Sequence, residues 1–232
     1  MELLEAEIPE PKGNEVRIRV EATGVAYPDI LIRISPQVEN EYPITLGYDA
    51  DGIVDKLGRE VKGLQVGQRV LCTNEEGVGG YTKMLCHPAD DLVFVPDGVE
   101  PAAAAAVGLN GVMAYQMVHR MAHVERDEKV LVHVAAGGTG HLLVQLSLLA
   151  GATVYGSTST QKQSIVESMG APPIDYQVED FETRIQELTK DGVDVIFDSV
   201  GGPNLQKIIP FFAQQGTDDH VWRCRRRLER CA

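Results

Sequence analysis

Residues 130–140, VLVHVAAGGTG, decide the fold of the second half of this 232-residue chain. A run of apolar and β-branched residues ends in a glycine-rich turn, and the segment 141–151, HLLVQLSLLAG, follows with the spacing of a helix. Gly151 is expected to end this helix, because glycine readily adopts the left-handed conformation that closes many helices. The pattern predicts a strand, a tight turn and a helix that packs back onto the strand.

Strand-like and helix-like segments continue to alternate after this turn. We predict strands at 153–159, 174–176 and 193–202, and helices at 161–170, 181–190 and 204–216. Gly170 is the expected end of the first of these helices. Such alternation is typical of a parallel sheet with helices on its faces, so the second half of the chain is predicted to be an α/β domain.

The sequence pattern of the chain up to Pro96 is different. Short β-rich segments are separated by glycine, proline, asparagine and aspartate, at 16–22, 50–58, 66–72, 79–86 and 92–96. Their close spacing predicts a compact antiparallel barrel or sandwich. A helix is expected at 101–118, although Gly108 and Gly111 weaken it.

The glycine-rich turn has the composition of a dinucleotide-binding loop. Gly137 would let a pyrophosphate approach the backbone, and Gly140 would let the helix pack closely on the strand. Free amides at the helix start favour an anion. Ala135 stands where the motif G-x-G-x-x-G has its first glycine. The alternative is a glycine-rich turn in a purely structural strand–helix unit.

The end of the next predicted strand indicates which dinucleotide would bind. NAD sites usually place Asp or Glu there, on the ribose hydroxyls. This chain instead has GSTSTQK, in which Ser157, Ser159 and Lys162 offer hydroxyls and a cation suited to a 2′-phosphate. The segment therefore favours NADPH over NADH, the alternative being a polar loop with a solvated lysine.

Composition excludes several classes of function. The formal net charge of −13 and the pI near 4.9 disfavour nonspecific binding to nucleic acid or anionic lipid. Four scattered cysteines are typical of a reducing compartment. The acidic opening MELLEAEIPE is unlike a signal peptide, and no apolar run is long enough to cross a bilayer. A cytoplasmic protein is predicted.

In these motifs the chain resembles the medium-chain dehydrogenase/reductase superfamily. Within that superfamily it resembles the zinc-independent NADPH:quinone reductases that include zeta-crystallin. The resemblance covers about residues 3–216 and rests on GVAYPDILIR (24–33), LGYDADGIV (46–54), LQVGQRV (64–70), AAGGTG (135–140) and FDSVGG (197–202). It implies an α/β fold with a β-rich GroES-like catalytic domain (1–122), a truncated, doubly wound Rossmann domain (123–216), and an active site in the cleft between them.

The resemblance also implies site residues and a reaction. Hydride would pass from NADPH to a quinone or an α,β-unsaturated carbonyl. The pyrophosphate would lie against Gly137, Gly138, Thr139 and Gly140, the 2′-phosphate among Ser159, Lys162 and Tyr176, and the nicotinamide ribose near Val200 and Gly201. No general acid or base is obvious. Tyr27 and Tyr48 are weak candidates for donating a hydrogen bond to the acceptor oxygen, with packing roles as the alternative.

Zinc ligands are missing from the positions where zinc-using relatives carry them. The Cys position corresponds to Ala26, Tyr27 and Pro28, and the His position to Tyr48 and Asp49. Because catalytic Zn²⁺ needs thiolate and imidazole ligands, no metal is predicted, which argues against a zinc alcohol dehydrogenase. His119 and His123 have a spacing that could share a metal, but paired surface histidines are the favoured interpretation.

Compared with the family, the chain looks truncated at both ends. Residues 217–232 form an aberrant basic tail with five arginines, and an arginine arm that binds nucleic acid is the disfavoured alternative. Without further family strands, the last strand should expose an unpaired edge. A family-like homodimer is doubtful for the same reason. Two other functions stay open: a catalytically impaired nucleotide-binding remnant, and an enoyl reductase-type domain.

Overall fold

The computed structural model describes residues 2–34, 44–74, 79–190, 192–201, 216–218 and 221–223. The chain divides into two compact units, Met1–Leu109 and Asn110–Ala232. This division falls within helix α2 (Pro101–Tyr115), earlier than the predicted domain boundary after residue 122, which stays a prediction. Within the described ranges, no helix has the length and apolar character needed to span a membrane.

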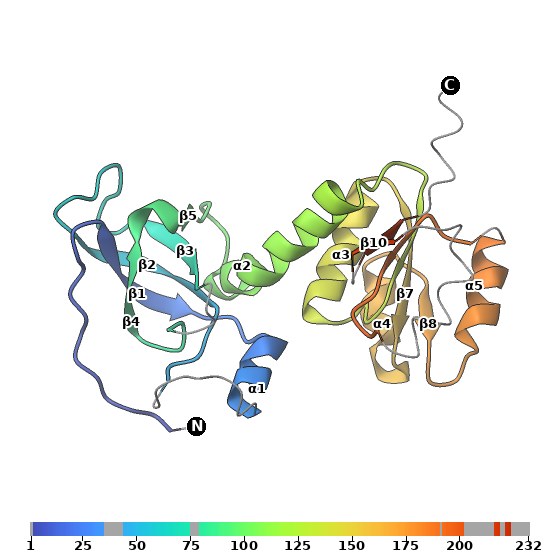
Figure 1. The fold of residues 1–232 in the computed structure, drawn as a ribbon, viewed down its shortest axis with the longest axis horizontal. Helices are drawn as coiled ribbons and strands as arrows, with labels where there is room; N and C mark the ends of the chain where they lie inside the picture. Colours follow the sequence, from blue (N-terminus) through green and yellow to red (C-terminus); the bar gives the residue numbers. More distant parts are fainter. Residues whose placement is uncertain are drawn as a thin grey trace. The chain divides into compact units, whose positions relative to one another are not determined.

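The first unit is built on an antiparallel five-stranded sheet with the strand order β4–β1–β2–β3–β5 (Figure 1). The antiparallel pairing predicted for this region is confirmed. Its elements are β1 (Glu15–Ala22), helix α1 (Tyr27–Ile34), β2 (Asp49–Leu57), β3 (Arg69–Thr73), β4 (Met84–Pro88), the short 3₁₀ turn η1 (Ala89–Asp91) and β5 (Val93–Phe94).

Alternation along β1 places its two faces in different surroundings. Val16 and Ile18 are fully buried and pack in a core with Val54 and Val70. Arg17, on the opposite face, donates from Nε to the Asp55 carboxylate at 2.6 Å. The strict apolar–polar period of this segment therefore has its cause in a sheet with one buried face.

The second unit contains a six-stranded sheet with the order β10–β11–β9–β6–β7–β8. Strand β6 pairs in parallel with both β7 and β9, and β7 pairs in parallel with β8. The predicted parallel sheet is therefore confirmed. The strands are β6 (Lys129–Val132), β7 (Thr153–Thr158), β8 (Pro173–Asp175), β9 (Val195–Phe197), β10 (Gly216–Asp218) and β11 (Val221–Arg223).

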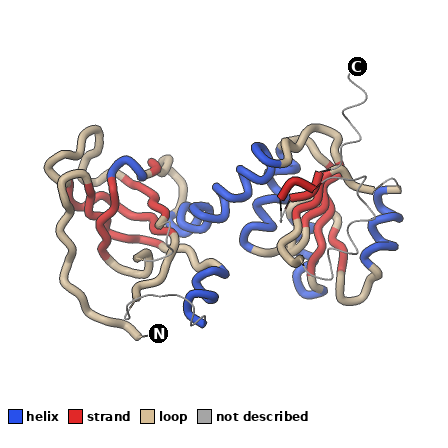
Figure 2. The backbone as a smooth tube through the Cα atoms, in the orientation of Figure 1, coloured by secondary structure: helices blue, strands red, loops and turns tan. Residues whose placement is uncertain are grey.

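Helices cover both faces of this sheet, as Figures 1 and 2 show. Val130 and Val132 face a core that includes residues of α3 and α4, whereas Leu131 between them faces a second core with Ile185 of α5. The continuous apolar character of the strand follows from burial on both sides. The helical elements are the π-helical turn η2 (Gln116–Met121), α3 (Gly138–Leu149), the 3₁₀ turn η3 (Thr160–Lys162), α4 (Gln163–Ser168) and α5 (Phe181–Thr189).

Several predicted boundaries shift. Helix α3 begins at Gly138, before the predicted start at residue 141, because the glycine turn already has helical geometry. The helix predicted at 101–118 divides into α2 and a π-helical turn. The strand predicted at 193–202 ends early, since the Asp198 carboxylate accepts the amides of Val200 and Gly201 and turns the chain. The helix predicted at 204–216 lies outside the described residues.

The expectation of an unpaired edge beyond the last parallel strand is wrong. Strand β11 pairs antiparallel with β9, in the register Val221↔Phe197 and Arg223↔Val195, and β10 pairs with β11. An open strand edge offers a row of backbone donors and acceptors, and an antiparallel strand can join it without a crossover helix. The first part of the basic tail thus extends the sheet.

Asp180 is the N-cap of α5, and its side-chain Oδ1 accepts the amide hydrogen of Thr183 at 2.8 Å. We expect Asp180→Ala to lower the free energy of unfolding by about 1 kcal/mol, because the first turn loses its acceptor. Urea unfolding followed by helical circular dichroism measures the change. Asp180→Asn is the control, since it keeps an acceptor; equal losses in the two variants would contradict the capping role.

Candidate functional site

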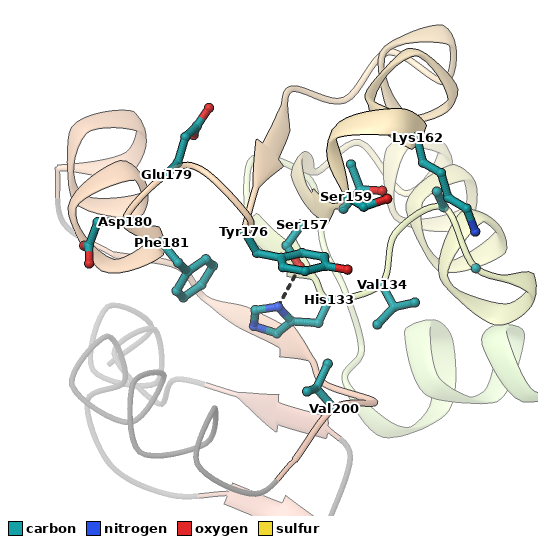
Figure 3. Close-up of a pocket in the computed structure, with 13 residues that line it drawn as sticks. His133, Val134, Ser157, Ser159, Lys162, Tyr176, Glu179, Asp180, Phe181 and Val200 are labelled. Carbon is teal, nitrogen blue, oxygen red and sulfur yellow. Dashed lines mark hydrogen bonds between the residues drawn. The ribbon is translucent and has the colours of Figure 1, made fainter.

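A pocket of about 420 Å³ lies in the second unit, at the carboxyl ends of its four parallel strands (Figure 3). The carboxyl ends of parallel strands meet at one edge of the sheet, where open α/β folds bind ligands. The lining residues follow or end β6, β7, β8 and β9, or belong to the starts of α3 and α5 and the turn η3. They are His133, Val134, Ala136, Gly137, Ser157, Thr158, Ser159, Lys162, Tyr176, Glu179, Asp180, Phe181 and Val200.

The turn between β6 and α3 is tight enough to require glycine at residue 140. A Cβ built on Gly140 would lie 2.1 Å from the carbonyl oxygen of Val134. Val134 itself has a φ of 55°, a left-handed conformation that a β-branched residue rarely adopts. The close helix–strand packing predicted for Gly140 is therefore present. The backbone of Val134, which contacts Gly140, is strained in this turn.

The start of α3 has the features of an anion site. Gly137 is its N-cap and contributes no side-chain hydrogen bond. The first amides of a helix lack intrahelical acceptors, and the helix dipole adds partial positive charge there. Thr139 Oγ1 donates to Asn110 Oδ1 at 2.9 Å, which ties this first turn to α2. The turn is thus held in place while its backbone donors stay available for a phosphate.

A group of polar side chains forms another part of the pocket wall. Ser159, Lys162 and Tyr176 all line it, and Lys162 is exposed (Figure 3). Two hydrogen bonds hold their segments together: Gln163 Nε2 to Asp175 Oδ2 at 2.8 Å, and Thr160 Oγ1 to Gln177 Oε1 at 3.1 Å. The loop after β7 is thereby fixed against the segment after β8, which places a cation and hydroxyls at one wall.

Five of the nine predicted cofactor residues line this pocket: Gly137, Ser159, Lys162, Tyr176 and Val200. The others lie next to it in sequence without forming its wall. Gly138, Thr139 and Gly140 make the first turn of α3, and the amide of Gly201 donates to Asp198 Oδ2 at 3.2 Å.

The two candidate catalytic tyrosines belong to the first unit. Tyr27 starts α1 and is 70% exposed, and Tyr48 directly precedes β2. Neither lines the pocket of the second unit. Their proposed contact with an acceptor stays a prediction.

His133 is a pocket residue that the sequence analysis missed. It follows β6, is 5% exposed, and its Nδ1 lies 2.7 Å from the Ser157 hydroxyl. The imidazole also packs against Phe181, with ring centres 5.0 Å apart and a tilt of 48°. Burial lowers the pKa of His133, while the nearby Asp198 carboxylate opposes that shift. A histidine within an otherwise apolar strand run was the signal that could have revealed it.

The acidic residues of the segments 24–33 and 46–54 have structural partners. Asp49 Oδ1 accepts the Leu109 amide at 2.8 Å, and a Cβ on Gly108 would lie 2.5 Å from the same oxygen. Burial raises the pKa of Asp49 to about 6 despite this hydrogen bond. Asp29, also buried, accepts the Ala26 amide at 2.8 Å. Among the described residues, no three His, Cys, Asp or Glu side chains form a group that could hold a metal ion.

Fold and pocket together define a GroES-like domain joined to a Rossmann-type nucleotide-binding domain. The family model described as the alcohol dehydrogenase GroES-like domain matches residues 12–97, and the one described as zinc-binding dehydrogenase matches residues 138–217. The chain belongs to the medium-chain dehydrogenase/reductase superfamily.

Individual relatives agree with this assignment. A 2-haloacrylate reductase from Burkholderia sp. is 34% identical over 91% of this chain and 66% of its own length. The synaptic vesicle membrane protein VAT-1 homolog-like of Mus musculus is 31% identical over 90% of this chain and 50% of its own. The structure of Escherichia coli quinone oxidoreductase complexed with NADPH superimposes with a TM-score of 0.83 at 29% identity, covering 93% of this chain and 71% of that one. The chain thus spans half to two thirds of these curated relatives.

Proposed function

We propose that this protein binds NADPH in the pocket of its second unit and transfers hydride from it to a quinone or an α,β-unsaturated carbonyl, without zinc. One observation carries the proposal: the glycine turn before α3 and the Ser159–Lys162 loop share one pocket. The first suits a diphosphate and the second a 2′-phosphate. No carboxylate stands at the end of β7, where one would select NADH.

The residues present fit the cofactor by charge and by shape. The amides of Gly138, Thr139 and Gly140 would hold the diphosphate, since α3 has no side-chain cap to compete for them. Lys162 would neutralise the 2′-phosphate, with hydroxyls of Ser159 and Tyr176 nearby. NADPH supplies the hydride when bound. The protein's contribution would be positioning and exclusion of water rather than metal-assisted polarisation.

Two relatives support the acceptor class. One is named for reduction of a haloacrylate, in which the double bond is conjugated to a carboxylate, and another for reduction of quinones. Both substrates contain a carbon–carbon double bond conjugated to a carbonyl or carboxylate group. A highly reducing polyketide synthase is also among the relatives, at 31% identity, so an enoyl reductase-type reaction stays an alternative.

A second candidate function is nucleotide binding without turnover. The observation that favours it is that all the residues lining the pocket belong to the second unit, so nucleotide binding there needs no residue of the first unit. Such a protein would hold NADPH with the same residues and would have no acceptor site of its own.

Purified protein mixed with NADPH and a simple quinone or enone separates the two functions. We expect loss of the absorbance of reduced nicotinamide, with NADH oxidised more slowly at equal concentration. Enhanced NADPH fluorescence without oxidation of any acceptor would support binding alone. No binding of NADPH by either readout would overturn both.

Zinc independence and a cytoplasmic location belong to the same proposal, and a family-like homodimer, doubtful for a truncated chain, is not part of it. Cys72 and Cys86, the described cysteines, are free thiols, which suits a reducing compartment. Dialysis against a zinc chelator should leave reductase activity unchanged, and a loss restored by Zn²⁺ would contradict zinc independence.

A further inference from the structure

We propose that His133 is a positioning residue of the nucleotide pocket that takes up a proton when the anionic nucleotide binds. This inference rests on the proposed function, because it needs a phosphate-bearing ligand in the same pocket. It goes further by giving the site a dependence on pH and by assigning a role to a residue that makes no part of the phosphate loop itself.

The geometry of His133 carries the first step. The ring lines the pocket yet is almost entirely buried, between Ser157 and Phe181 (Figure 3). Its Nδ1 has the Ser157 hydroxyl at 2.7 Å, but its Nε2 is buried with no hydrogen-bond partner among the described residues. A buried polar atom without a hydrogen-bond partner costs free energy, so a ligand that offers this nitrogen a partner would be favoured.

The backbone around His133 links it to both loops of the pocket. Its amide donates to the Phe197 carbonyl oxygen at 2.9 Å, at the end of β9, and the strained Val134 follows it at the start of the phosphate turn. Asp198, the residue after β9, is buried, and its carboxylate accepts hydrogen bonds from the amides of Val200 and Gly201. A charge on His133 would therefore be felt by both loops.

The charged and titratable groups around His133 set its state in the free protein. Among the pocket's lining residues they are Lys162 from η3, Tyr176 after β8, and Glu179 and Asp180 before α5. Asp198, after β9, is a further charged neighbour of His133. Desolvation outweighs the attraction of Asp198, so burial holds the pKa of His133 below its usual value. The imidazole is thus neutral near pH 7 when the pocket is empty.

A bound nucleotide changes this balance. The diphosphate and 2′-phosphate of NADPH would bring several negative charges into the pocket that His133 lines, and nearby negative charge favours imidazolium. Ser157 can accommodate the change because its hydroxyl can either donate to Nδ1 or accept from it. The proton comes from solvent. Protonated Nε2 then becomes a hydrogen-bond donor in a pocket to which the bound nucleotide has added acceptor oxygens.

Calorimetric titration with NADPH tests the inference directly. Titrations are made at about pH 7 in PIPES, HEPES and Tris, which differ in ionisation enthalpy. The slope of the observed binding enthalpy against the ionisation enthalpy of the buffer gives the number of protons taken up. We expect uptake of roughly half a proton per nucleotide bound, and Kd about fivefold tighter at pH 6.5 than at pH 8. The 2′-phosphate would release rather than take up protons on binding a cation, so it cannot produce this sign.

The matched variants are His133→Gln and His119→Gln. His119 lies on the π-helical turn, outside the pocket lining, and its variant should take up protons as the wild type does. His133→Gln should bind NADPH with no uptake and a flat pH profile. If that variant does not fold, imidazole ¹⁵N shifts of the labelled wild type should show one histidine becoming protonated on NADPH binding. Uptake that persists in His133→Gln, or binding without uptake in the wild type, would overturn the inference and leave the proposed function standing; absence of NADPH binding would overturn both.

Discussion

Gly140→Ala is expected to lower the free energy of unfolding of the second unit by about 2–3 kcal/mol, the upper part of the range for an overpacked core. Alanine normally stabilises a helix relative to glycine, so propensity alone predicts the opposite sign. The new Cβ would lie 2.1 Å from the Val134 carbonyl oxygen, and that oxygen belongs to backbone already strained at a φ of 55°. Neither the helix nor the turn can move aside without disturbing the other.

Gly138→Ala is the matched control in the same helical turn. A Cβ on Gly138 would meet only the Asn110 side-chain amide at 3.3 Å, which can shift. Its effect on unfolding should stay within about 0.5 kcal/mol. Chemical unfolding of both variants, followed by helical circular dichroism, measures the difference. Similar stabilities for the two would show that the phosphate turn is not closed against the strand as described.

Lys162→Glu is expected to weaken NADPH binding at least tenfold, about 1.4 kcal/mol, with little change for NADH. Lys162 lies on the pocket wall with Ser159 and Tyr176, and only NADPH carries a 2′-phosphate for it to neutralise. Reversing the charge replaces attraction with repulsion at that phosphate alone. Fluorescence titration of both nucleotides on wild type and variant measures the effect.

Lys83→Glu serves as the control for Lys162→Glu. It changes the net charge equally, from an exposed position in the first unit that does not line the pocket. NADPH and NADH affinities should both stay near their wild-type values in this control. Equal losses for the two nucleotides in Lys162→Glu would contradict the assignment of Lys162 to the 2′-phosphate.

Much of the second unit could be predicted because its signals are local. Gly151 and Gly170 follow the ends of α3 and α4 with a φ of 89° each, as glycines at helix ends do. The apolar runs that became β6, β7 and β9 are buried on both faces, and that burial is what makes them continuous in sequence. The position of the phosphate turn followed from the same local pattern.

Features that depend on tertiary neighbours could not be predicted in this way. His133 is part of the pocket because Ser157, on the next strand, and Phe181, at the start of α5, come to lie against it. The antiparallel addition of β11 to β9 joins segments far apart in sequence, and its basic composition disfavoured a place in the sheet. Periodicity reports which face of an element is buried, but it does not report which other element covers it.

A titration of ¹⁵N-labelled protein with NADPH, observed through backbone amide NMR, tests the claim that the amides of Gly138, Thr139 and Gly140 bind the diphosphate. We predict the largest shift changes at these amides, together with changes in the Ser159–Lys162 loop that NADH does not reproduce. Saturable binding that leaves residues 138–140 unshifted, or no binding at all, would contradict the claim.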